Sequence, residues 1–192
     1  MRLIKNLLAS VGLIALIVGG FAYYRAQQLL AELDPKALET YGDFATKFME
    51  TKDPGTAMVW SVPVAEGLSP EDVKESLKSL AVQRNFLFVG ESPFYKQAEA
   101  VTGEQYRYVS FLSFCDVRVG MQMADYNGAY TSFMPCRIAI VEDTAGKLWL
   151  HTLNLDLMIH GGRELPPELK EGALRVRNTI WEIMHGAARG EF

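Results

Sequence analysis

One segment of the sequence holds most of the side chains that could do chemistry. It runs over residues 113–137 and reads SFCDVRVGMQMADYNGAYTSFMPCR. Sulfur ligands of this kind suit soft metal ions such as Cu(I), and two cysteines can also form a disulfide or a redox pair. The segment contains both cysteines of the chain and three of its eight methionines, namely Cys115, Cys136, Met121, Met123 and Met134.

The first interpretation of Cys115 and Cys136 is a structural disulfide. One cysteine ends a predicted strand and the other begins the next, and closing a loop of this length would stabilise the fold by about 3 kcal/mol. Two free, buried thiols are the alternative. A redox pair fits less well, because the spacing is not that of a CxxC motif. Cys115 precedes a predicted helix, which favours a thiolate, but the charge of Asp116 opposes it.

A soft-metal site is the competing hypothesis for the same segment. Met121, Met123 and Met134 would add thioether ligands to the cysteines, and copper would be the metal. Methionine is also a common filler of irregular cores, so the three residues could simply pack. No CxxCH motif is present, which gives no support to covalently bound haem. The sequence therefore predicts no cofactor, with copper as the one candidate.

His160 is a candidate addition to such a site, together with Asp156. His160 lies four residues after Asp156 near the end of a predicted helical turn, where a local pair is the simplest role. The sequence contains no nucleophile elbow, phosphate loop or zinc motif. We therefore expect a binding or accessory module rather than an enzyme. A small-molecule enzyme with a pocket between sheet and helices is a further alternative.

The N-terminal 30 residues are typical of a membrane anchor. Arg2 and Lys5 precede an uncharged run over residues 7–24, which a helix would extend to roughly 27 Å, close to the bilayer core. Tyr23 and Tyr24 suit the far interface. A cleaved signal peptide is the alternative, although VGGFAYY makes a poor cleavage site.

The charges around this run predict its orientation. Basic residues stay on the cytoplasmic side, so the N-terminus should be cytoplasmic and the remainder exported. In a bacterium this describes a single-pass protein of the inner membrane with a periplasmic domain, where disulfides persist. The net charge is −4 and no basic run follows the anchor, so we expect no nucleic-acid partner.

Local patterns predict the remaining elements. Asp34 and Pro35 should begin a helix over residues 34–51, and Asp116 should cap another that ends at Asn127. A strand is the alternative for this second segment, because its apolar residues from Val117 to Met123 also alternate. We expect an anchor over 1–30, a juxtamembrane helical segment over 31–55 and an α+β domain over 56–192. This domain should be a two-layer sandwich of a mixed sheet with helices on one face. Strands are predicted at 56–64, 86–91, 106–114 and in a hairpin after Cys136, and further helices at 68–85, 92–103 and 166–192.

The region from about Val62 to Met158 resembles the family known as domain of unknown function 302. The resemblance rests on LSPEDVKESLKSL, NFLFVGE, YRYVSFLSFC and above all MPCRIAIVEDTAGKLWLHTLNLDLM. It implies a compact α+β domain that is often dimeric, and it implies no reaction. The anchor, the two cysteines and a C-terminal helix ending in GEF depart from the family pattern. We expect the chain to contact the membrane through its N-terminal helix. Its protein partner should be a second copy of the chain or a subunit of a membrane complex.

Overall fold

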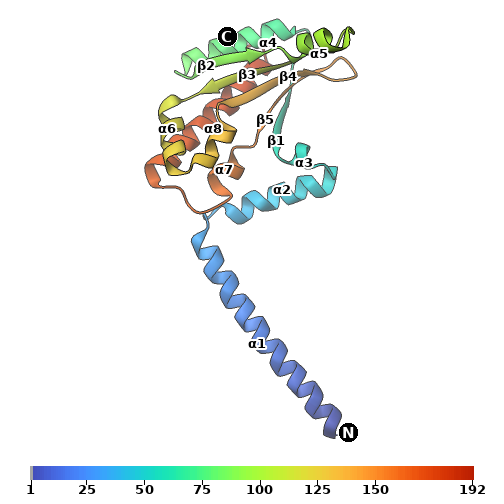
Figure 1. The fold of residues 1–192 in the computed structure, drawn as a ribbon, viewed down its shortest axis with the longest axis vertical. Helices are drawn as coiled ribbons and strands as arrows, with labels where there is room; N and C mark the ends of the chain where they lie inside the picture. Colours follow the sequence, from blue (N-terminus) through green and yellow to red (C-terminus); the bar gives the residue numbers. More distant parts are fainter. Residues whose placement is uncertain (1) are drawn as a thin grey trace.

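A helix of 31 residues, α1 (Arg2–Glu32), stands away from the rest of the molecule (Figure 1). The computed structural model describes residues 2–192, without the side chains of residues 2–4, 7 and 8. Within that part, α1 is the helix whose length and composition suffice to cross a membrane, over Ala9–Glu32, and none of this stretch is buried. A signal sequence would have the same length and composition, so the structure agrees both with a membrane anchor and with a signal sequence.

Five strands in the described part form one sheet in the order β1-β5-β4-β3-β2. Every neighbouring pair is antiparallel, so the expectation of a mixed sheet is wrong. Local patterns do not determine strand pairing, and the fold places β1 beside β5 and β2 beside β3. The strands are β1 (Val59–Pro63), β2 (Leu87–Ser92), β3 (Val109–Cys115), β4 (Cys136–Glu142) and β5 (Leu148–Leu153).

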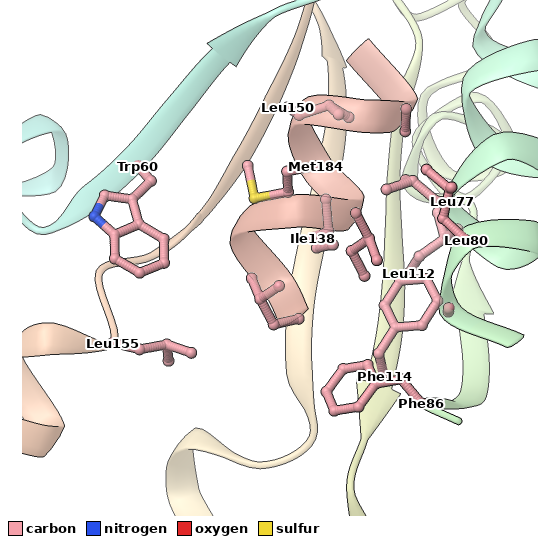
Figure 2. Close-up of a cluster of buried hydrophobic side chains, with 14 of the residues drawn as sticks. Trp60, Leu77, Leu80, Phe86, Leu112, Phe114, Ile138, Leu150, Leu155 and Met184 are labelled. Atoms are coloured by element: carbon pink, nitrogen blue, oxygen red, sulfur yellow. The ribbon is translucent and has the colours of Figure 1, made fainter. Parts of the chain in front are cut away.

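Helices α4 (Pro70–Gln83) and α8 (Pro167–Ala188) cover one face of the sheet. Ser69 and Asp72 form a capping box that begins α4, and this helix confirms the one predicted over residues 68–85. Inward-facing strand residues alternate with outward-facing ones, which is the period expected of a half-buried sheet. Figure 2 shows part of the resulting core, which includes Trp60, Leu77, Leu80, Leu112, Phe114, Ile138, Leu150 and Met184.

The sulfur-rich segment forms two helices between β3 and β4. Asp116 accepts hydrogen bonds from the backbone N–H groups of Arg118 and Val119 and so begins α6 (Val117–Tyr126). This confirms the predicted helix and its cap. A 3-10 helix, η1 (Gly128–Phe133), follows and was not predicted. Both elements lie at one end of the sheet, beside α7 (Asp156–His160) and α8 (Figure 1).

The juxtamembrane segment forms α2 (Ala37–Thr51) and the short α3 (Pro54–Ala57). Helix α2 begins at Ala37 rather than at Pro35, because the Asp34 side chain turns into the domain and is buried there. Two further short helices complete the chain. They are α5 (Phe94–Thr102), which packs at the β2–β3 edge, and α7 (Asp156–His160).

Candidate functional site

An apolar pocket lies at the end of the sheet where β3 stops and β4 starts. Helices α6, α7, α8 and η1 close around it. Five of the lining residues carry sulfur, and the single charged lining residue among those described is Asp116. We call it the sulfur-lined pocket and define it by Cys115, Met123, Met134, Cys136 and Met158.

Strand register brings the two cysteines to this place. Cys136, the first residue of β4, pairs with Phe114 of β3. Cys115 is the next residue of β3, so the two cysteines lie at neighbouring positions on adjacent strands. Gly120 of α6 lies directly beside them. A Cβ atom on Gly120 would stand 3.4 Å from Met134 Sδ and 3.5 Å from Cys115 Sγ. These two sulfur atoms therefore approach the same point, and the glycine leaves that point free.

The size of the pocket limits what it can hold. Its volume is about 60 Å³. A cavity of about 150 Å³ is needed to hold a benzene molecule in a rigid core, whereas one water needs roughly 10–15 Å³. The sulfur-lined pocket therefore suits an ion or a group of few atoms better than an organic metabolite.

Both cysteines are free thiols in the structure. Burial, together with the neighbouring Cys115, raises the pKa of Cys136 to about 12. Burial also raises the pKa of Cys115, with the Asp116 carboxylate adding to the effect. Neither thiol is thus disposed to be a thiolate nucleophile at neutral pH. The predicted disulfide between them stays a prediction.

The structure separates the remaining sulfur candidates. Met123 and Met134 line the pocket, whereas Met121 is exposed on the outer side of α6. Met158 of α7 is an additional lining residue that sequence reasoning missed. It lies 22 residues after Cys136 in a short turn, so no spacing pattern links it to the cysteines. Within the described residues, no group of three or more His, Cys, Asp or Glu side chains could hold a metal.

His160 and Asp156 do not belong to the sulfur-lined pocket. They lie on the other side of α7, at a polar cleft of about 340 Å³ between α2 and α8. The predicted local pair between them is not formed. His160 Nδ1 lies 3.0 Å from Asp34 Oδ1, and Arg177 donates two hydrogen bonds of 3.0 Å to the Asp156 carboxylate.

Asp34 is the centre of a buried ionic network. Its side chain is completely inaccessible, and the Lys170 ammonium lies 2.7 Å from Oδ2. Burial by itself would raise the pKa of Asp34. The contacts with Lys170, the backbone N–H of Lys36 and His160 outweigh burial and hold this pKa below its ordinary value. The Asp34 carboxylate has a structural role. It joins the α1–α2 junction to α7 through His160 and to α8 through Lys170.

The second face of the sheet carries no α4 or α8 packing. One row across it pairs Ser61 with His151, His151 with Ala139, and Ala139 with Phe111. Ser61 Oγ lies 2.8 Å from His151 Nδ1. Burial lowers the pKa of His151. Trp149 stacks beside His151, with ring centroids 6.2 Å apart. This half-exposed, aromatic surface is named the open sheet face.

Comparison with known proteins identifies the fold. Residues 60–187 match the family described as "Domain of unknown function DUF302". The structure is similar to the crystal structure of an uncharacterized conserved DUF302 protein from Bacillus stearothermophilus, with a TM-score of 0.56. The identity is 14%, and the likeness, which concerns the fold alone, covers 69% of this chain and 98% of that one. No curated protein matches the sequence.

The matched range is longer than the region in which the resemblance was recognised. It continues to residue 187 and so includes nearly all of α8. The C-terminal helix is therefore shared with the family. The expectation that this helix departs from the family pattern is wrong. Helices α1 to α3 precede the match. The chain belongs to the DUF302 family.

Proposed function

We propose that this protein is a membrane-anchored module that binds a soft monovalent metal ion of the Cu(I) type in the sulfur-lined pocket. The observation that carries the proposal is the approach of Cys115 Sγ and Met134 Sδ to one point beside Gly120, with Cys136 next to them. Thiolate and thioether ligands select Cu(I) over harder ions. The small volume suits an ion, and binding would displace the thiol protons.

The raised thiol pKa values favour metal binding over thiol-redox chemistry. Thiol–disulfide exchange needs a thiolate that is already formed when the partner disulfide arrives. Desolvation raises the pKa of Cys115 and of Cys136 and so opposes formation of that thiolate. A metal ion instead supplies the positive charge that stabilises the thiolate on binding. The lining is otherwise apolar, and its one carboxylate, Asp116, caps helix α6. The proposal is therefore a binding protein.

The proposal includes the anchor. Helix α1 would span the bacterial inner membrane once, with the N-terminus in the cytoplasm and the DUF302 domain in the periplasm. Its apolar stretch and the basic residues before it support this topology. Anchoring would keep the domain at high effective concentration near membrane partners that deliver or receive the ion.

Metal titration tests the proposal. We expect the full chain in detergent to remove Cu(I) from a competing chromogenic chelator at one ion per chain under reducing, oxygen-free conditions. Replacing Cys115 with serine should weaken this affinity by more than about 100-fold, because a thiolate ligand is lost. Met121→Leu is the matched control, since Met121 is exposed and outside the pocket. It should bind like the unmodified chain.

Two results would count against the metal site. One is equal affinity in Cys115→Ser and the unmodified chain. The other is an intact mass showing that Cys115 and Cys136 form a permanent disulfide in protein taken from the membrane, which was the first interpretation of the sequence.

The open sheet face favours a second candidate function, self-association through this face. It presents Ala139, His151 and Trp149, with Phe111 beside Phe94 of α5 at its border. Apolar surfaces of this kind mark interaction sites. A homodimer would also agree with the expectation from the family resemblance. An accessory role in a membrane complex would use the same surface.

Introducing a charge at the centre of this face tests the dimer. Ala139 lies between Phe111 and His151, so Ala139→Glu would bury a carboxylate in the interface and should convert dimers to monomers. Light scattering after size-exclusion chromatography measures the mass. The control is Val82→Glu, at an exposed apolar position on α4. A monomeric unmodified chain at every concentration would exclude this second function.

A further inference from the structure

Helix α2 has an exposed apolar face that no element of the described chain covers. Ala37 and Thr40 are buried against the domain, and Phe44 and Lys47 are half-buried on the same side. The next arc around the helix is apolar and exposed, with Leu38 65% and Met49 68% accessible. Its members are Leu38, Tyr41, Ala45, Phe48 and Met49, and the polar arc beyond it carries Glu39, Asp43, Thr46 and Glu50.

The position of α2 is set by its attachment to the domain. Figure 1 shows α2 lying across the end of the domain that is next to α1. Only residues 33–36 separate the two helices. The Tyr41 hydroxyl donates a 2.6 Å hydrogen bond to the Gly161 carbonyl, and the Asp34 N–H donates one of 2.8 Å to Gly162. Together with the Asp34 network, these contacts keep α2 from swinging away from the domain.

We infer that α2 is an interfacial helix whose apolar face lies in the lipid bilayer at the exit of α1. This inference rests on the proposal that α1 spans the membrane, taken over the stretch Ala9–Glu32, because the end of that stretch places residues 33–36 at the bilayer surface. An amphipathic helix there buries its apolar arc among headgroups and upper acyl chains while its charged arc stays in water. The occupant of the exposed face is thus the lipid surface itself.

Charge plays little part in this contact. Helix α2 carries Glu39, Asp43 and Glu50 against one basic residue, Lys47. Anionic headgroups would therefore not attract it, and apolar burial is the driving force. The contact should be equally strong on neutral phosphatidylcholine and insensitive to salt. It would hold the domain at a fixed orientation, because α2 is attached to α7 and α8, which line the sulfur-lined pocket.

Tryptophan quenching by brominated lipid tests the inference on the full chain in phosphatidylcholine vesicles. Phe48→Trp reports the apolar arc, Thr46→Trp the polar arc of the same helix, and Ile17→Trp the centre of α1. The unmodified chain gives the background from Trp60, Trp149 and Trp181. We expect Phe48→Trp emission to shift to shorter wavelength and to be quenched by bromine near the headgroups, and Thr46→Trp emission to do neither.

The three variants separate failure of the inference from failure of the anchor. If Ile17→Trp is quenched by deep bromine while Phe48→Trp behaves like Thr46→Trp, α1 spans the bilayer and the interfacial role of α2 is wrong. If Phe48→Trp is shielded from aqueous iodide but not quenched by brominated lipid, a protein surface covers α2 and the inference is again wrong. If neither Ile17→Trp nor Phe48→Trp responds to lipid, both proposals fail.

Discussion

Replacing Asp34 with alanine is expected to lower the free energy of unfolding by about 3–5 kcal/mol. Removing one partner of a buried ion pair leaves the others without compensation, and losses of this size are typical. Asp34 contacts both His160 and Lys170, and its side chain is inaccessible to solvent. Urea denaturation of the full chain in detergent, followed by tryptophan fluorescence, measures the change.

Glu32→Ala provides the control for this prediction. Glu32 also pairs across the α1 junction, with Arg163 at 3.3 Å, but both side chains are largely exposed. Exposed pairs contribute about 0–1 kcal/mol, so this variant should unfold almost like the unmodified chain. Equal midpoints for Asp34→Ala and Glu32→Ala would contradict a structural role of the buried network.

The Asp34 network also predicts a dependence of stability on pH. The folded pKa of Asp34 is held below its ordinary value of 3.8. Its contribution to stability is therefore fully present above the unfolded pKa and is lost as the pH falls through the lower folded pKa. The difference in unfolding free energy between the unmodified chain and Asp34→Asn should accordingly shrink on acidification below about pH 4. A difference that does not change with pH would argue against a charged Asp34.

Replacing Gly120 with alanine is expected to weaken soft-metal binding strongly without destabilising the fold. The added methyl group would stand 3.4 Å from Met134 Sδ and 3.5 Å from Cys115 Sγ, in the space that a shared ion would occupy. These distances are ordinary van der Waals contacts. Alanine is also favoured over glycine inside a helix by about 1 kcal/mol. We expect unchanged or slightly raised stability and an affinity for Cu(I) reduced by about 100-fold or more.

Gly42→Ala is the matched control for Gly120→Ala. Gly42 lies inside α2, and a Cβ atom there would meet nothing within 4 Å. The substitution makes the same change in helix propensity far from the sulfur-lined pocket, so it should leave the Cu(I) affinity unchanged. Retained binding in Gly120→Ala would show that the ion does not lie between Cys115 and Met134.

Local signals in the sequence determined most of the elements. The capping box at Ser69, the cap at Asp116 and the hairpin after Cys136 each act within a few residues, so their consequences can be deduced without the fold. The apolar run of α1 is local in the same sense. The family resemblance rested on these elements too, and the match over residues 60–187 confirms it.

Contacts between distant residues were decided only by the tertiary structure. His160 was expected to pair with Asp156 four residues away, but packing of α7 against α2 and α8 brings it to Asp34, 126 positions away. Strand order is likewise a global property, which is why a mixed sheet was expected and an entirely antiparallel one is found.

The sulfur-lined pocket combines both kinds of information. The sequence by itself placed Cys115, Cys136 and Met134 in one excursion between two strands, since the chain connecting neighbouring strands must return to the same end of the sheet. Only the fold showed that α6 turns Met123 inward and Met121 outward, and that α7 adds Met158. The direction of a helix face depends on what it packs against, and that partner lies elsewhere in the chain.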